Sequence, residues 1–212
     1  MSLTYTIPKI EKKAIFKLNY ERDRKILADV DGVLLDWESA FDAWMTKEGY
    51  TVKVPNIYKQ NERYDIGKWE SDKLVKTFNE CAWIGFLKPL RDSVDVLHKL
   101  ASQHWHIECI TSLSTDHWAG ELRRMNLERF FGKGCVRRVR CIDTGADKDE
   151  ILKEYEHSYW WIEDKPDNCE AGLRAGHKPI LMDHPYNQDY QNPAVKRVQN
   201  WQDIYNLITE SA

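Results

Sequence analysis

The chain has 212 residues, a length that suits one domain with an insertion and allows a substantial buried core. Its 31 Lys and Arg residues and 34 Asp and Glu residues give a net charge of −3, which excludes a polycationic surface for gripping long nucleic acid. The apolar runs fall far short of the roughly 20 residues needed to cross a bilayer, so we expect no membrane span.

Cysteine usage and the start of the chain predict a cytoplasmic protein. The five cysteines are scattered and contain no CxxC pair, so neither a disulfide framework nor a zinc site is indicated. The start shows no apolar segment behind basic residues, which a secretion signal would contain. We therefore expect reduced thiols in a cytoplasmic location.

Short β-rich runs alternate with helical patterns from residue 25 onward, which is typical of parallel βαβ units in an α/β fold. The expected strands cover residues 25–30, 105–110, 136–142, 159–162 and 179–182. Residues 1–24 form a charged N-terminal extension whose role is not readable, with one expected strand at residues 14–18.

Helical spacing and capping residues place helices between these strands. We expect helices at 92–101, from a Ser114 cap to about residue 125, at 147–155, from Pro166 to Gly176, and from an Asn200 cap through residue 207. Residues 39–88 break the alternation, because they look helical at 41–46 and 74–78 and contain no confident strand. The sequence therefore predicts a helical insertion at 39–88 between core segments 25–38 and 89–212.

The first strand ends in an Asp-x-Asp-Gly motif, with carboxylates at Asp29 and Asp31 and a glycine at Gly32. This motif places two acids at the carboxyl edge of a parallel sheet, where ligands of open α/β folds bind. The bend at the glycine allows acids two positions apart to converge on one site. On its own, the motif is equally compatible with a plain turn that leaves a strand.

Three further segments place chemically useful side chains at the same edge. Thr111 and Ser112 follow the second strand with hydroxyl groups that can donate to a phosphoryl oxygen. Lys148 opens a helix, where its ammonium and the helix amino end favour an anion. The fourth strand runs into Glu163 and Asp164, whose oxygens suit a hard divalent cation such as Mg²⁺.

These segments resemble the four motifs of the haloacid dehalogenase superfamily, over the chain from about residue 25 to its end. The resemblance implies a doubly wound, mostly parallel sheet with a small helical cap inserted after the first strand. It also implies a phosphatase or phosphomutase, because dehalogenases of the superfamily lack the acid that stands here at Asp31 and ion pumps carry Thr there.

The resemblance assigns a role to each motif residue. Asp29 would attack phosphorus to form an aspartyl-phosphate, and Asp31 would act as general acid and then general base. Mg²⁺ would be held by Asp29, Asp164 and the main-chain carbonyl of Asp31. Thr111 and Lys148 would stabilise the transferring phosphoryl group, and Glu163 would orient the metal waters.

A finer resemblance is to the 5'(3')-deoxyribonucleotidases and their bacterial and phage relatives. It rests on short matches at residues 31–37, 86–90, 111–112, 147–148, 185–187 and 200–201. It implies a nucleoside monophosphate as substrate, with Ser112 as a second phosphate donor. Related nucleotidases often carry Arg at the position of Ala146, and Arg140 or Lys165 are the candidates to compensate.

Several alternatives remain open at this stage. Trp37 either stacks on a nucleotide base or anchors the hinge of the cap. The substrate is alternatively a sugar phosphate or a polynucleotide 3' end, and a third reading is a non-catalytic binding module. A small phosphate ester is the expected partner, and a homodimer is compatible with the sequence.

Overall fold

The computed structural model describes residues 24–210, so the strand expected at residues 14–18 lies outside the described part of the chain. Six strands form one sheet in the order β3-β2-β1-β4-β5-β6, and every neighbouring pair is parallel. Their bounds are β1 Lys25–Ala28, β2 His106–Thr111, β3 Val136–Cys141, β4 Trp160–Glu163, β5 Lys178–Met182 and β6 Lys196–Val198. The predicted α/β fold with a parallel sheet is confirmed.

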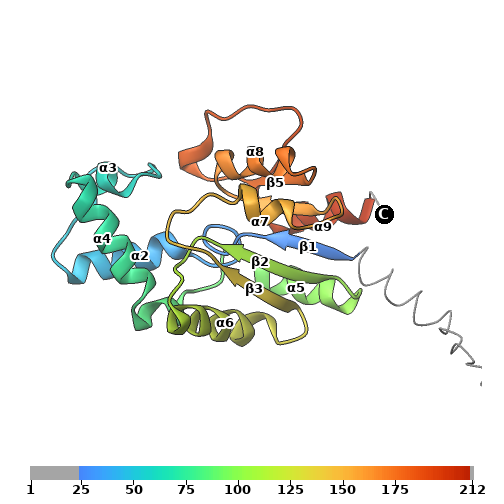
Figure 1. Cartoon of the computed structure of the whole chain (residues 1–212), viewed down its shortest axis with the longest axis horizontal. Coiled ribbons are helices and arrows are strands. Elements are labelled where there is room, and N and C mark those ends of the chain that lie inside the picture. The colour runs from blue at the N-terminus through green and yellow to red at the C-terminus, as the bar shows by residue number, and fades with distance from the viewer. Residues whose placement is uncertain (1–23, 211–212) are drawn as a thin grey trace, which may run out of the picture.

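Helices cover both faces of this sheet (Figure 1). Because side chains alternate along a strand, Ile26 and Ala28 of β1 pack into one hydrophobic cluster and Leu27 into another. The first cluster takes in α5 (Ser93–Ser102), α6 (His117–Phe131) and α9 (Trp201–Glu210). The second takes in α7 (Asp149–Lys153) and α8 (Pro166–Arg174). The sheet is therefore doubly wound.

The order of the strands reverses at β1, which lies between β2 and β4. Chain connections lead away from this point on opposite faces of the sheet, so loops separate at the carboxyl ends of β1 and β4. Ligands of open α/β folds bind at such a switch point. The fold thus places residues 29–32 and 163–165 where chemistry is expected.

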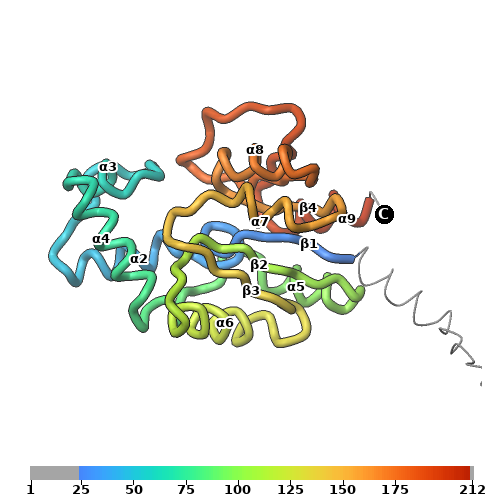
Figure 2. Tube along the Cα trace, viewed as in Figure 1, coloured from blue at the N-terminus to red at the C-terminus, as the bar shows by residue number. Residues whose placement is uncertain are grey.

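The segment inserted after β1 forms a group of helices at one end of the molecule (Figures 1 and 2). Its elements are α2 (Trp37–Lys47), α3 (Gln60–Tyr64), α4 (Lys68–Asn79) and the 3-10 helix η1 (Ala82–Phe86). The chain pairs with itself where it leaves and re-enters the core, because the Asp36 N–H donates to the Lys88 carbonyl and the Leu90 N–H to the Leu34 carbonyl, both at 2.9 Å. These helices form the cap expected after the first strand.

Several boundaries differ from the prediction for local reasons. The first strand stops at Ala28, because the N–H groups of Leu34 and Leu35 turn back to the Val30 carbonyl. Helix α6 begins at His117 rather than after Ser114, since the Asp116 carboxylate caps it by accepting from the Ala119 N–H at 2.8 Å. Strand β6 was not predicted, because three residues with two charges give no strand pattern.

The last predicted cap is present, with the Asn200 side chain accepting from the Asp203 N–H at 3.0 Å. Within residues 24–210, no helix is both long and apolar enough to cross a membrane.

Candidate active site

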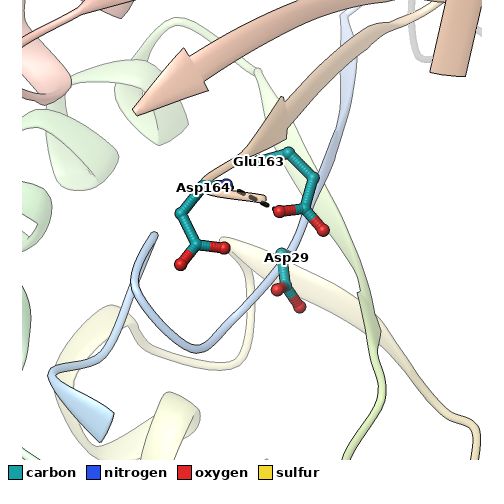
Figure 3. A group of neighbouring side chains, drawn as sticks. All are labelled: Asp29, Glu163 and Asp164. Carbon is teal, nitrogen blue, oxygen red and sulfur yellow. Dashed lines mark hydrogen bonds between the residues drawn. The ribbon is translucent and has the colours of Figure 1, made fainter. Parts of the chain in front are cut away.

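Three carboxylates meet at the carboxyl ends of β1 and β4 (Figure 3). Asp29 follows β1 directly, and its N–H bonds to the Ile162 carbonyl of β4 at 2.9 Å. Glu163 ends β4, and Asp164 follows it. Each of the three offers a carboxylate oxygen within 4.8 Å of the others, and all three residues are buried. The structure thus brings together Asp29 and Asp164, which the sequence separates by more than half of the chain.

Glu163 is held by four donors that occupy both of its oxygens. One oxygen accepts from the Lys148 ammonium at 2.7 Å and the Asn168 amide at 2.6 Å. The other accepts from the N–H groups of Asp164 at 2.6 Å and Lys165 at 2.7 Å. Burial raises the pKa of Glu163, but Lys148 and the N–H groups of Asp164 and Lys165 together outweigh that effect, so the pKa is lowered. The Glu163 side chain therefore holds Lys148 and the turn after β4 in place. This position is compatible with the expectation that Glu163 orients the waters of a metal ion.

Lys148 stands immediately before α7 and is only 1% exposed. Its ammonium bridges Asp29 at 2.9 Å and Glu163 at 2.7 Å. Burial alone would lower the pKa of Lys148, but the two carboxylates raise it, so the side chain stays charged. The structure therefore places the charged Lys148 side chain between Asp29 and Glu163, at the start of a helix.

Negative charge exceeds positive charge in this cluster. Burial, together with Glu163 and Asp31 and against the opposing effect of Lys148, raises the pKa of Asp29 to about 7. Burial and the charges of Glu163 and Asp29 raise the pKa of Asp164 well above its usual value. Three carboxylates share one ammonium, so two negative charges have no counter-charge in the cluster. A divalent cation would supply the missing charge, and carboxylate oxygens are ligands that such cations prefer.

The carboxylate of Asp31 lies outside this cluster. Both of its oxygens contact the guanidinium of Arg123 on α6, at 2.6 and 2.8 Å. Burial raises the pKa of Asp31, and Arg123 opposes that shift. The sequence pattern did not reveal Arg123, because nothing distinguishes an arginine within a helix 92 positions away.

The two predicted hydroxyl donors are placed differently. Thr111 ends β2 at the same edge of the sheet and is 1% exposed. The hydroxyl of Ser112 donates to the Ala146 carbonyl at 2.8 Å, which ties the loop after β2 to the loop that leads to Lys148. In this structure the Ser112 hydroxyl braces the two loops.

Among the described residues, the side chains expected to compensate for Ala146 contact other groups than Asp29, Glu163 or Asp164. The Arg140 guanidinium pairs with Glu154 at 2.6 Å. The Lys165 ammonium lies 5.9 Å from the ring centre of Tyr58 in the cap. The guanidinium that reaches an Asp-x-Asp-Gly acid is that of Arg123.

A loop after β5 contacts Asp164. Residues 185–187 of this loop are among the short matches to the deoxyribonucleotidases, and the sequence assigned them no role. The 3-10 helix η2 (Pro185–Asn187) presents the Tyr186 hydroxyl, which donates to a carboxylate oxygen of Asp164. The Asn187 amide donates to the main-chain carbonyl of Asp164 at 2.8 Å. A ring nitrogen of His184 lies 2.7 Å from the Gly32 carbonyl. This loop therefore contacts both Asp164 and the turn after β1.

Gly32 is required by its surroundings as well as by its backbone. Its φ of +74° is one that other residues adopt only with strain, and a Cβ there would lie 2.3 Å from a carboxylate oxygen of Asp164. Gly32→Ala is expected to cost about 1–3 kcal/mol of unfolding free energy and to displace the acid. Urea unfolding and metal titration measure the two effects.

Gly132→Ala is the matched control for Gly32→Ala, since Gly132 has a φ of +75° and open space around its Cβ position. It should lose stability through strain alone and keep metal binding. Equal metal binding in both variants would contradict the crowding of Gly32 against Asp164.

The cap reaches the site through an aromatic contact. The Tyr58 ring lies 5.4 Å from that of Tyr186, which in turn contacts Asp164. Trp37 is placed in the cap interior, stacked on Phe41 with ring centres 4.5 Å apart. Its indole N–H donates to Asn79 at 2.9 Å. These contacts favour Trp37 as an anchor of the cap hinge over a base-stacking role.

Solved structures with the same fold include a phosphatase and a dehalogenase. A haloacid dehalogenase-like hydrolase from Streptococcus pneumoniae aligns with a TM-score of 0.63 at 12% identity, covering 87% of this chain and 97% of its own. A D,D-heptose 1,7-bisphosphate phosphatase from B. bronchiseptica, solved with magnesium and phosphate, aligns with a TM-score of 0.56 at 12% identity, covering 89% and 99%. At these identities the likeness establishes the fold.

Sequence comparison adds a phage relative and a family. An uncharacterized 32.4 kDa protein from the Gp30-rIII intergenic region of Enterobacteria phage T4 is 26% identical over 195 residues, which cover 86% of this chain and 69% of the relative. The sequence model of the family "5' nucleotidase, deoxy (Pyrimidine), cytosolic type C protein" matches residues 24–212. The chain therefore belongs to this 5'-nucleotidase family, and it shares the fold of a haloacid dehalogenase-like hydrolase.

Proposed function

We propose that the chain is a magnesium-dependent phosphomonoesterase that hydrolyses nucleoside monophosphates through a phosphorylated Asp29. The observation that carries the proposal is the meeting of Asp29, Lys148 and Asp164 at the switch point of the sheet. In this proposal Asp29 is the nucleophile, the Lys148 ammonium neutralises part of the charge, and Asp164 is a ligand of the cation. Membership of a 5'-nucleotidase family supports the substrate class.

The reaction has two steps. In the first, a carboxylate oxygen of Asp29 attacks phosphorus, the bond from phosphorus to the ester oxygen breaks, and Asp31 gives its proton to the leaving alcohol. In the second, water attacks the phosphorus of phospho-Asp29 while Asp31 takes a proton from that water. The products are an alcohol and inorganic phosphate, and Asp29 and Asp31 return to their starting forms.

The other residues stabilise charge around the nucleophile. Lys148, which already contacts Asp29, and Thr111 at the end of β2 are the proposed donors to the phosphoryl oxygens. Asp29, Asp164 and the main-chain carbonyl of Asp31 are the proposed ligands of Mg²⁺. A bound Mg²⁺ would screen the repulsion between the Asp29 carboxylate and the phosphate.

The cap favours a small ester over a polymer. Tyr58 of the cap contacts Tyr186 beside the cation site, so the cap borders the space that a substrate enters. The chain also has a net charge of −3, which does not attract a polyanion. The "cytosolic" description of the family agrees with a cytoplasmic location for this protein.

A panel of phosphate esters tests the proposed substrate. Purified protein with Mg²⁺ is assayed for phosphate release from deoxynucleoside 5'- and 3'-monophosphates, sugar phosphates and 3'-phosphorylated oligonucleotides. We expect the highest kcat/KM for a mononucleotide, with little dependence on salt. A preference for sugar phosphates, or for oligonucleotides with strong salt dependence, would overturn the nucleotide assignment.

Magnesium is expected to stabilise the folded protein through Asp164. At a Mg²⁺ concentration about 100 times the dissociation constant, binding to the native state adds about 2.7 kcal/mol. Thermal unfolding with and without EDTA measures the shift, and Asp164→Asn should abolish it. Asp167→Asn, at an exposed acid three residues away, is the control and should keep the shift. An unchanged magnesium response in Asp164→Asn would remove Asp164 from the metal site.

A further inference from the structure

The guanidinium of Arg123 is buried within the protein and turned toward the Asp-x-Asp-Gly turn. Its side chain is 0% exposed, and its two terminal nitrogens contact the two oxygens of Asp31 at 2.6 and 2.8 Å. A two-point contact between these planar groups fixes the orientation of the carboxylate as well as its distance. Asp31 is thereby held by a side chain from another element.

Burying the charged Arg123 guanidinium costs folding free energy unless the ion pair with Asp31 offsets that cost. Within residues 24–210, Asp31 is the hydrogen-bonding or ion-pair partner that the structure gives Arg123, and the Arg123 Nε atom is buried without one. A buried charge with a single partner destabilises a fold more often than it helps it. The next residue, Arg124, instead pairs at the surface with Glu121 and Glu128. The burial of Arg123 therefore points to a role in the site rather than in folding.

Asp31 has little else to fix its side chain. It lies in the turn after β1 and is 25% exposed, whereas Asp29 and Glu163 are each tied to Lys148. Proton transfer requires the acid to lie within hydrogen-bonding reach of the reacting oxygen in the right orientation. An unrestrained carboxylate at this turn would spend part of its time in other rotamers.

We propose that Arg123 is a positioning residue that holds the Asp31 carboxylate in the orientation from which it exchanges protons with the leaving oxygen and with water. The inference rests on the proposed phosphatase reaction. Because α6 is packed against β3 and η1, the guanidinium is carried by a rigid element. Arg123 acts through Asp31 and makes no contact with the substrate.

Variants at Arg123 test this role in turnover of the best deoxynucleoside monophosphate. Arg123→Met is expected to lower kcat about 100-fold with little change in KM, because a misplaced proton donor slows chemistry without weakening binding. Arg123→Lys, which keeps the charge but loses the two-point contact, should fall between Arg123→Met and the wild type. Arg124→Met is the matched control and should retain wild-type kcat.

A double-mutant cycle separates positioning from other roles. Once Asp31→Asn has removed the carboxylate, adding Arg123→Met should change kcat by less than about twofold. A further loss of about tenfold or more would show that Arg123 contacts phosphate or supports the fold, and would overturn the inference. A wild-type kcat in the Arg123→Met variant would also overturn the inference. If the Arg123→Met variant does not fold, Arg123→Lys replaces it in the cycle. The effect of Arg123→Lys is then measured once in the wild type and once in the Asp31→Asn protein.

The Asp31→Asn protein distinguishes failure of the proposed function from failure of the inference about Arg123. Wild-type turnover by the Asp31→Asn protein would remove Asp31 from the reaction and overturn both the mechanism and the inference. A large loss in Asp31→Asn with full activity in Arg123→Met overturns the inference alone.

Discussion

Asp29→Asn is expected to lower phosphatase turnover by at least about 1,000-fold, because the amide cannot attack phosphorus. The folded protein should survive the change. Lys148 keeps its contact with Glu163 at 2.7 Å, and one of three mutually repelling carboxylates is removed. Phosphate release with Mg²⁺ measures the activity, and thermal unfolding without Mg²⁺ confirms the fold.

The control for Asp29→Asn is Asp95→Asn, which removes an exposed carboxylate from α5 and should leave turnover unchanged. Turnover within tenfold of wild type in Asp29→Asn would exclude this residue as the nucleophile. Loss of activity together with loss of thermal stability would instead indicate a folding role.

Lys148→Met is expected to damage both stability and catalysis. The variant leaves Asp29 and Glu163 buried without their shared ammonium, and breaking a buried ion pair costs about 3–5 kcal/mol. Loss of a preorganised charge beside the phosphoryl group should lower kcat by about 100- to 1,000-fold. Urea unfolding in metal-free buffer measures the first effect, and steady-state kinetics with Mg²⁺ measures the second.

Lys153→Met serves as the comparison for Lys148→Met, since the Lys153 side chain is 53% exposed and pairs with Glu150 at the surface. Such a pair contributes about 0–1 kcal/mol, so the variant should keep both its stability and its turnover. If the two lysine variants unfolded at the same urea concentration, Lys148 would have no special part in neutralising the site.

The acids and hydroxyls that the sequence identified share one property, which is their position at the end of a predicted strand, whereas Lys148 lies at the start of a helix. Asp29 and Asp164 follow apolar runs that only a buried strand explains, and parallel strands bring their carboxyl ends to one edge. The sequence therefore predicts their meeting without knowledge of the strand order. The resemblance to a known superfamily supplied the cap and the roles.

The residues that were missed reach the site from positions without such a pattern. Arg123 lies in α6, where Trp118 is 71% and Met125 52% exposed while the arginine is buried. Reading hydrophobic residues as the inner face of that helix would place Arg123 in solvent. Tyr186 reaches Asp164 from a 3-10 turn that lies between β5 and the short strand β6. Neither contact has a local signal in the sequence.

Trp37 and Ser112 lie in motifs that match the family, but their side chains make structural contacts that the motifs do not predict. Of the two alternatives for Trp37, its packing on Phe41 favours the anchor of the cap hinge, and Ser112, a candidate phosphate donor, donates to the Ala146 carbonyl. Both side chains hold the cap or the loops in place. Motif position predicts where a residue lies, whereas its contacts depend on neighbours that the motif does not contain.

Trapping the phosphorylated enzyme tests the central claim most directly. The Asp31→Asn protein is mixed with Mg²⁺ and p-nitrophenyl phosphate, whose leaving group departs without needing a proton, so that only the second step lacks its general base. The reaction is quenched in acid, and the digested peptides are weighed by mass spectrometry. We predict one phosphoryl group, located on Asp29. A phosphoryl group on any other residue, or nitrophenol release without a modified Asp29, would contradict the account.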